Sequence, residues 1–165
     1  MRVACCALEG RSGHKAGRWL LSVLYRHETG EPMPEILRTD RGKPYFKDSP
    51  LHFSITHTKK HAFCVLSCRN VGIDAEELDR RVNLRLAEKI LSPGELRQFM
   101  QSEDRKKTLL TFWVLKEAQV KLTGEGLQGY PNHTDFTLPH EAVREVDGCL
   151  LAILEEKDGG NGHAV

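Results

Sequence analysis

The chain has 165 residues, of which 39% are hydrophobic and 28% are charged, and this composition is typical of a folded globular protein. Its length predicts one compact unit, or two small halves that share a core. Lys and Arg total 24 and Asp and Glu total 23, for a formal charge of +1, so the charge balance does not favour a general nucleic-acid-binding protein.

The chain opens with an apolar run, residues 3–8, that predicts a first strand. This run is too short for the core of a signal peptide, and no later apolar stretch approaches the length of a membrane span. We therefore expect a cytoplasmic protein with no membrane partner. Residues 10–13 indicate a loop, and apolar residues at helical spacing then predict a helix from Lys15 to about His27.

Three further strands are predicted in the middle of the chain. Apolar and polar residues alternate over residues 51–56, which indicates a half-buried strand. Residues 62–66 form an apolar run short enough for a buried strand, and residues 71–76 form another strand after a turn at 69–70. The close succession of these three runs predicts a meander.

The next part of the chain is predicted to be helical. Apolar residues recur at helical intervals over residues 84–91, and Ser92 then begins a new helix, with a proline in the first turn and Glu95 completing a capping box. The longest predicted helix covers about residues 107–122 and ends at the glycines of residues 124–126.

Two late strands are predicted at residues 136–138 and 150–154, and the glycine-rich residues 158–165 predict a frayed tail. The order of elements is therefore strand, helix, strands, and then helices and strands again. This order predicts the α+β class, with helices grouped on one side of antiparallel sheet.

Two carboxylates in the predicted strand at residues 71–76 form the first candidate site. Asp74 and Glu76 are two positions apart, so they face the same side of the strand. Neighbouring carboxylates repel unless a cation or a proton separates them, and hard oxygen ligands favour magnesium, calcium or manganese. The polar edge of a half-exposed strand would give the same pattern, and this motif alone favours that structural explanation.

A second candidate site lies on the longest predicted helix. Trp113, Glu117 and Lys121 are four residues apart and form one line on the helix surface. Glu117 is thus a third candidate carboxylate, with a cation one turn away. An ion pair on a solvated helix is the alternative, but the tryptophan on the same line indicates that this face packs against something.

A third candidate site combines a Gly-Lys-Pro element with a later Thr-His pair. Lys43, held between Gly42 and Pro44, and the nearby Thr56 and His57 would suit phosphate binding. A plain turn at the lysine and a histidine that caps the end of its own strand are the alternatives.

Together these segments resemble the 4′-phosphopantetheinyl transferase family. The similarity runs in order through Gly42-Lys43-Pro44, the segment from Phe53 to Thr58, the segment from Gly72 to Glu76, and the spaced residues from Trp113 to Leu127. It covers about residues 41–127, and Arg18 with Leu20 and Leu21 matches an upstream helix more loosely. The long last segment makes chance agreement of the full set improbable.

The likeness is to the Sfp-type class, whose members carry two related halves in one chain. It implies an α+β fold of two related α/β halves, with antiparallel sheets and helices packed on them. Here the implied division is a shortened first half at residues 1–70, a second half with the metal site at residues 71–157, and a flexible tail at residues 158–165.

The resemblance also implies roles for the acidic residues. Asp74, Glu76 and Glu117 would hold Mg²⁺ together with the pyrophosphate of coenzyme A, and Lys121 matches the lysine that touches this pyrophosphate. Asp74, Glu117 and Lys121 are the expected catalytic residues. Glu117 is expected to be both a metal ligand and the base.

The remaining coenzyme contacts follow from the same likeness. Lys43 and His57 match positions near the adenosine 3′-phosphate and ribose, and Arg18 is expected to join them. Thr56 stands where the family usually has serine, and it keeps the hydroxyl. Glu95 matches a glutamate sometimes considered for catalysis, and its capping box is an equally good explanation.

The implied activity is transfer of the 4′-phosphopantetheine group from coenzyme A to a serine hydroxyl of an apo acyl or peptidyl carrier protein, releasing 3′,5′-ADP. The enzyme would be of the holo-[acyl-carrier-protein] synthase type and would serve fatty-acid, polyketide or nonribosomal peptide biosynthesis. The alternatives are another Mg²⁺-dependent nucleotide or pyrophosphate enzyme such as a hydrolase, and a non-catalytic binder of coenzyme A or a carrier protein. A pure binder has no need for three acidic positions together with Lys121.

Two basic groups follow from this expectation. The first half is shorter than is usual in the class, and the basic residues that it retains before the Gly-Lys-Pro element include Arg11, His14, Lys15 and Arg18. Carrier proteins tend to present acidic helices, so a basic patch favours the encounter. The first candidates for this patch are Arg80, Arg81 and Arg85.

Overall fold

The structure is a computed structural model that describes residues 1–125 and 134–157. Gly126, Leu127 and the expected tail at residues 158–165 lie outside the described residues. Within those described residues, no helix combines the length and the apolar character that a membrane crossing requires.

The first half of the chain forms a three-stranded antiparallel sheet with one helix on it. Its elements are β1 (Arg2–Ala7), α1 (Gly13–Thr29), β2 (Ile36–Arg38), β3 (Pro44–Phe46), β4 (His52–His57) and β5 (His61–Ser67). The sheet has the strand order β1-β5-β4, and β2 and β3 form a separate hairpin beside it.

The second half repeats this plan with a longer helical connection. Its elements are β6 (Val71–Glu77), the 3-10 turn η1 (Leu84–Leu86), α2 (Ala87–Ile90), α3 (Pro93–Gln101), α4 (Arg105–Thr123), β7 (Val143–Val146) and β8 (Cys149–Glu155). The strand order β6-β8-β7 places the first strand at one edge and the last strand in the middle, as in β1-β5-β4. The expected α+β class with two related halves is therefore confirmed.

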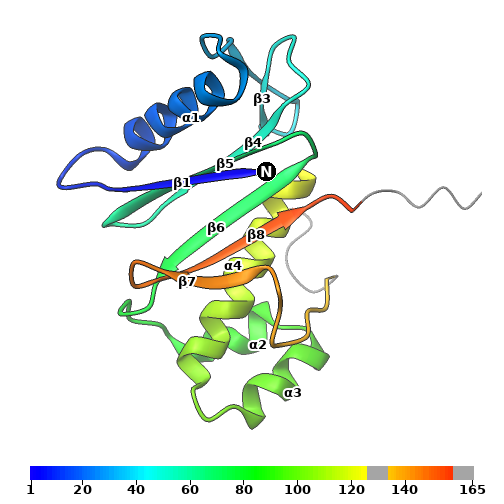
Figure 1. Cartoon of the computed structure of the whole chain (residues 1–165). Helices are drawn as coiled ribbons and strands as arrows, with labels where there is room; N and C mark the ends of the chain where they lie inside the picture. Colours follow the sequence, from blue (N-terminus) through cyan, green and yellow to red (C-terminus); the bar gives the residue numbers. More distant parts are fainter. Residues whose placement is uncertain (126–133, 158–165) are drawn as a thin grey trace, which may run out of the picture.

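The two sheets pack face to face, with α1 outside the first sheet and α4 outside the second (Figure 1). Strand alternation produces these layers, because successive side chains point to opposite faces. In β5, Cys64 packs toward α1 while Phe63 and Val65 pack toward the second sheet. In β8, Leu151 faces the first sheet while Leu150 packs toward α4.

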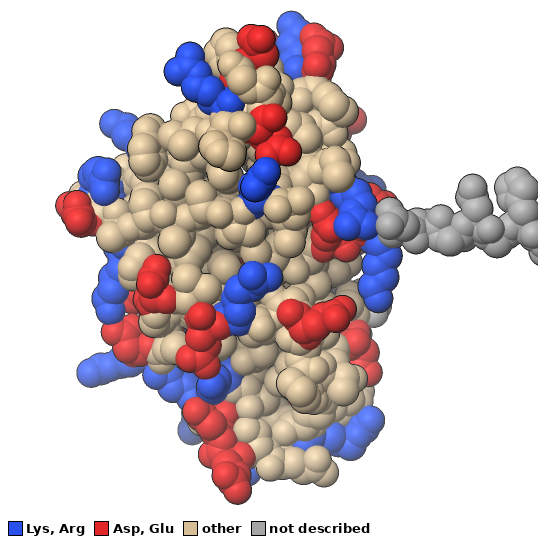
Figure 2. Space-filling model, in the orientation of Figure 1, with Lys and Arg blue, Asp and Glu red and all other residues tan. Residues whose placement is uncertain are grey.

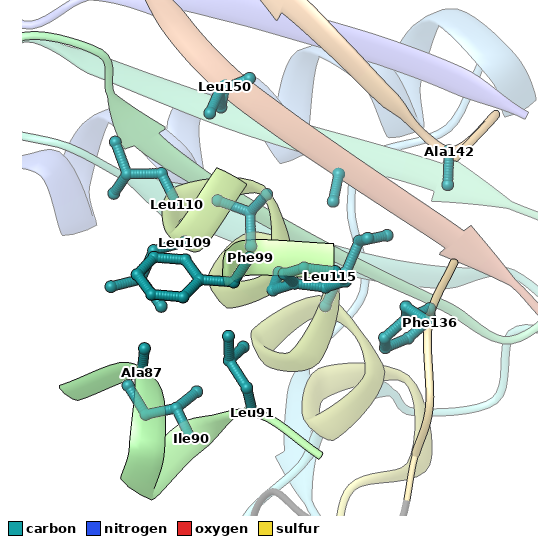
Figure 3. Close-up of a cluster of buried hydrophobic side chains, with 14 residues drawn as sticks. Ala87, Ile90, Leu91, Phe99, Leu109, Leu110, Leu115, Phe136, Ala142 and Leu150 are labelled. Atoms are coloured by element: carbon teal, nitrogen blue, oxygen red, sulfur yellow. The ribbon is translucent and has the colours of Figure 1, made fainter. Parts of the chain in front are cut away.

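Helices α2 and α3 cover the part of α4 that the second sheet leaves open. Phe99 of α3 and Ile90 and Leu91 from the end of α2 cluster with Leu109 and Leu115 of α4 (Figure 3). The predicted capping box is present, since Ser92 Oγ accepts from the Glu95 amide and the Glu95 carboxylate accepts from the Ser92 amide. This cap fixes where α3 begins.

The predicted meander is wrong. Strands β4 and β5 pair as a hairpin, but β6 leaves that sheet and pairs with β8 from the end of the chain. Residues 136–138, predicted as a strand, have no regular secondary structure. The hairpin β2–β3 and the short strand β7 were not predicted, because three or four residues give too little periodicity to detect.

Charged side chains of both signs are interspersed on the face shown in Figure 2, which agrees with the near-neutral composition. No single-sign field dominates this face. A large part of its upper half is uncharged. On this face, a basic site would therefore be a local feature.

Candidate functional site

A pocket of about 400 Å³ lies where the two halves meet. Its walls come from the start of α1, the hairpin β2–β3, strand β4 and the C-terminal end of α4. The lining residues are His14, Arg18, Arg38, Arg41, Gly42, Lys43, Pro44, Phe53, Ser54, Ile55, His57, Val120, Lys121 and Gly124.

The charge of this pocket is one-sided. Seven of its lining residues carry basic side chains: His14, Arg18, Arg38, Arg41, Lys43, His57 and Lys121. None of the described lining residues is acidic. A concave site with this charge favours an anionic ligand with several phosphate groups, since guanidinium and ammonium groups form strong charge-assisted hydrogen bonds to phosphate oxygens.

Four of the five predicted coenzyme-binding residues come together here, and the fifth, Thr56, does not line the pocket. Arg18, Lys43, His57 and Lys121 all line the pocket although they are far apart in the sequence. Gly13 allows the start of α1 to lie close to His57 of β4, because a Cβ at Gly13 would lie 2.5 Å from Cγ of the His57 ring. The start of α1 therefore lies directly on the end of β4.

Lys43 makes contacts that the sequence did not predict. Its ammonium donates to the carbonyl oxygen of Leu122 and to Asn70 Oδ1. Burial lowers the pKa of Lys43, while the nearby Glu156 carboxylate opposes that shift. The positive charge of Lys43 is thus engaged by the C-terminal end of α4 and the junction between the halves.

Gly72 allows α4 to lie directly on β6. A Cβ at this position would lie 2.0 Å from the Ala118 carbonyl oxygen and 2.5 Å from the Leu122 amide nitrogen. Such distances exclude any larger residue unless the helix moves away. Asp74 is two residues further along and faces the same side, so its carboxylate meets α4.

Asp74 is the centre of a small polar network. The ammonium of Lys121 donates to Asp74 Oδ1 at 2.6 Å, and the Thr56 hydroxyl donates to the same oxygen at 3.0 Å. Asp74 is buried and Lys121 is half-buried. The structure therefore joins three predicted site residues from β4, β6 and α4.

The other two predicted carboxylates are placed differently. Glu76 forms an ion pair with Arg80, four residues further on. Glu117 is half-buried, one helical turn before Lys121 on α4. In the part of the chain that the structure describes, no group of three or more His, Cys, Asp or Glu side chains is arranged to hold a metal ion.

A second hollow, of about 740 Å³, lies beside Glu76. It is lined by His57, Thr58, Lys59, Lys60, Glu76, Glu77, Asp79, Arg80 and Arg81. His57 lines both hollows, and Glu76 of β6 lines only the second one. A macromolecule that bound here would reach Glu76.

Glu95 and Lys116 form a buried ion pair at 2.8 Å, with side-chain exposures of 0% and 2%. Glu95 also accepts from the amides of Ser92 and Phe136, and Lys116 also donates to the Thr134 carbonyl oxygen. These contacts support a structural role for Glu95. They hold residues 134–136 against α3 and α4.

Three residues at these sites were missed by the sequence analysis. Arg38 lies in the unpredicted strand β2, Asn70 was read only as part of a turn, and Lys116 lay within the matched segment without an assigned role. A charged residue on the otherwise buried side of α4 was the signal that could have identified Lys116.

Comparison with known proteins gives one consistent result. A family model described as the 4′-phosphopantetheinyl transferase superfamily matches residues 70–155. The protein named 4′-phosphopantetheinyl transferase HetI from Nostoc sp. is 33% identical over 129 residues, covering 72% of this chain and 54% of that protein. The 4′-phosphopantetheinyl transferase AcpT from Salmonella typhi is 33% identical over 148 residues, covering 86% and 75%.

A solved structure was also matched, that of Thermotoga maritima holo-[acyl-carrier-protein] synthase. It has 27% sequence identity and a TM-score of 0.44, covering 54% of this chain and 64% of that one. The chain spans about half the length of several curated relatives that it matches, with 54%, 46% and 52% covered in three of them.

Proposed function

The chain belongs to the 4′-phosphopantetheinyl transferase superfamily, and from this premise we propose that it transfers the 4′-phosphopantetheine group of coenzyme A to a serine of an apo acyl or peptidyl carrier protein. The observation that carries the proposal is the position of the basic pocket. Its wall includes Lys121, whose ammonium reaches Asp74 at 2.6 Å. A phosphate-rich ligand in the pocket would therefore end beside the carboxylates of β6.

We assign the coenzyme to the basic pocket. Arg18 and His57 would bind the phosphate on the ribose, and Lys121 would bind the pyrophosphate. Thr56 would act through Asp74, because its hydroxyl already donates a hydrogen bond to that carboxylate. Lys43 lines the same pocket.

The acidic residues fit Mg²⁺ by their chemistry. Asp74 and Glu76 present hard oxygen donors on one side of β6, and Glu117 on α4 is the third proposed ligand. Mg²⁺ at phosphate-transferring sites is usually held by one or two carboxylates together with substrate phosphates and water. When bound, the ion would neutralise charge on the pyrophosphate and on the leaving 3′,5′-ADP.

The residues of the chain would then have distinct tasks. Glu117 would take the proton of the carrier serine, whose oxygen attacks the β-phosphorus of coenzyme A. A new phosphorus–oxygen bond forms to the serine while the bond to 3′,5′-ADP breaks, and Lys121 would stabilise the charge that develops there. Positioning and electrostatics would supply most of the acceleration, as in other phosphoryl transfers.

We assign the chain to the Sfp-type class, with halves at residues 1–70 and 71–157. The equivalent strand orders β1-β5-β4 and β6-β8-β7 support this division. The metal site would belong to the second half and most of the coenzyme pocket to the first.

The decisive experiment is to incubate the protein with Mg²⁺, coenzyme A and a panel of apo carrier proteins, and to follow intact carrier mass and free 3′,5′-ADP. We expect one phosphopantetheine group per carrier and an equal amount of 3′,5′-ADP. A hydrolase would release the nucleotide without any carrier, and a non-catalytic binder would release none. An Asp74→Asn variant, which removes a proposed ligand, is the negative control.

A further inference from the structure

Lys43 links the hairpin side of the pocket to the end of α4. It lies in the turn before β3, in the first half, and its side chain crosses to the second half. Its ammonium donates to the Leu122 carbonyl oxygen in the second half and to Asn70 Oδ1 at the end of the first half. Asn70 Nδ2 donates to the same carbonyl at 2.9 Å.

The accepting carbonyl belongs to the last turn of α4, which ends at Thr123 with Gly124 as its cap. Carbonyls in the last turn of a helix lack intrahelical partners, and they form the negative end of the helix dipole. A lysine ammonium placed there is stabilising. Packing reinforces the contact, because a Cβ at Gly124 would lie only 2.9 Å from Cδ of Lys43.

The basic residues around Lys43 are not engaged in the same way. Arg18 and Arg41 line the pocket, and within residues 1–125 and 134–157 neither side chain forms a hydrogen bond or an ion pair. Their guanidinium groups are therefore available to a ligand. Lys43, by contrast, already uses two of its three ammonium donors on acceptors of the protein, so only one donor remains for a phosphate.

We propose that Lys43 is a positioning residue that holds the C-terminal turn of α4 against the first half, while Arg18 and Arg41 supply the charge for the ribose phosphate. Lys121 directly precedes Leu122, whose carbonyl accepts from Lys43. The same helical turn therefore determines how the Lys121 ammonium meets Asp74. This inference rests on the proposed function for the identity of the ligand.

The test compares coenzyme A with 3′-dephospho-coenzyme A as substrates for the wild type, Lys43→Met, Lys43→Arg and Arg41→Met. A positioning residue acts on both substrates alike, so Lys43→Met is expected to raise KM by the same factor for both, about tenfold. Lys43→Arg keeps the charge and should recover most of this loss. Arg41→Met should raise KM for coenzyme A and leave 3′-dephospho-coenzyme A unchanged.

Two outcomes would overturn the proposal. One is a Lys43→Met variant impaired with coenzyme A alone, which would indicate direct phosphate contact. The other is an unchanged KM with a lower apparent kcat that returns to the wild-type value once the rate is divided by the folded fraction, which would indicate only a smaller folded fraction. If Lys43→Met fails to fold, Asn70→Ala removes the other side-chain donor to the same carbonyl, and an unchanged KM for both substrates in that variant would count against the proposal.

A measurement without any coenzyme separates this proposal from the proposed function. Hydrogen exchange of the amides at residues 122–125 should become faster in Lys43→Met than in Arg41→Met. If the wild type modifies no carrier but this difference is present, the proposed activity fails and the positioning role stands. Equal exchange rates of these amides in the two variants would contradict the positioning role.

Discussion

The ammonium of Lys121 on α4 lies 2.6 Å from Asp74 Oδ1 on β6, so a helix and a strand of the second half meet through opposite charges. In the proposed reaction Lys121 also stabilises the pyrophosphate. We expect Lys121→Met to lower kcat/KM by about 100-fold, since removal of one preorganised donor to developing charge typically costs this much. Lys89→Met, the same change on the exposed side of α2, should leave transfer unchanged. Equal rates in the two variants would contradict the assigned role.

Glu117 is predicted to be the base of the reaction. Glu117→Gln keeps the size of the side chain but cannot take a proton, so turnover with an apo carrier should fall by about 100-fold to 10,000-fold. The measurement is the rate of carrier modification at saturating Mg²⁺ and coenzyme A. Glu88→Gln on exposed α2 is the matched control. Full turnover by the Glu117→Gln variant would refute its role as base.

The buried pair Glu95–Lys116 is predicted to be a large stability determinant. Lys116→Met leaves Glu95 buried without its cation, and such an uncompensated charge typically costs about 3–5 kcal/mol of unfolding free energy. Urea denaturation measures this loss. Lys107→Met removes the 2.6 Å pair with Glu145, whose two side chains are about half exposed, and should leave the midpoint unchanged. A similar small effect in Lys116→Met would show that the pair is not sealed from water.

Long periodic segments could be predicted from the sequence, and short ones could not. The span of α4 and the cap of α3 follow from local signals, since Ser92 and Glu95 complete their capping box within one turn. The pairing of β6 with β8 could not be predicted, because local sequence does not show which of the two sheets a strand joins. Ile73 and Leu151 are buried between the two sheets. Strand β8 is apolar on both faces from Cys149 to Ile153, so no polar side reveals which strand it pairs with.

The candidate site shows the same limit. Asp74, Lys121 and Thr56 were identified by type and spacing, and the structure brings them into contact. The engagement of Lys43 with the Leu122 carbonyl could not be predicted, because it depends on where the end of α4 lies relative to the first half. The sequence identifies a basic residue, but only the fold shows which acceptors already hold it.

Thiol reactivity tests the packing of the two sheets. Burial raises the pKa of Cys64 to about 12, and burial also raises the pKa of Cys149, so at pH 8 both thiols are protonated as well as inaccessible. Burial and the neighbouring Asp147 raise the pKa of the exposed Cys5. We expect a disulfide reagent at pH 8 to label exposed Cys68 first and Cys5 more slowly, and to reach Cys64 and Cys149 only after unfolding.

A rise in pH provides the control for that order. Because the thiolate is the reactive form, an increase from pH 8 to pH 9.5 should speed the labelling of Cys5. Cys64 should stay unlabelled at both pH values, because its side chain is 0% exposed and no reagent reaches it until the protein unfolds. Peptide mass analysis of partially labelled protein gives the order. Early labelling of Cys64 would show that α1 does not cover β5 as described.

Arg81 is predicted to steer the carrier protein to the site. It is exposed and lines the hollow beside Glu76, while its neighbour Arg80 is paired with Glu76. Attraction between a basic patch and an acidic carrier weakens as salt rises, because the Debye length falls from about 10 Å at 0.1 M to about 3 Å at 1 M. In the wild type, kcat/KM for the carrier should therefore decline with added salt.

Arg81→Glu reverses one charge at this surface, so it should lower kcat/KM for the carrier at low salt and flatten the salt response. It should leave KM for coenzyme A unchanged, because Arg81 does not line the coenzyme pocket. Arg97→Glu changes the net charge equally from an exposed position on α3 and serves as the control. If both variants keep the wild-type salt dependence, steering does not depend on this hollow, and the carrier approaches the β6 carboxylates from another side.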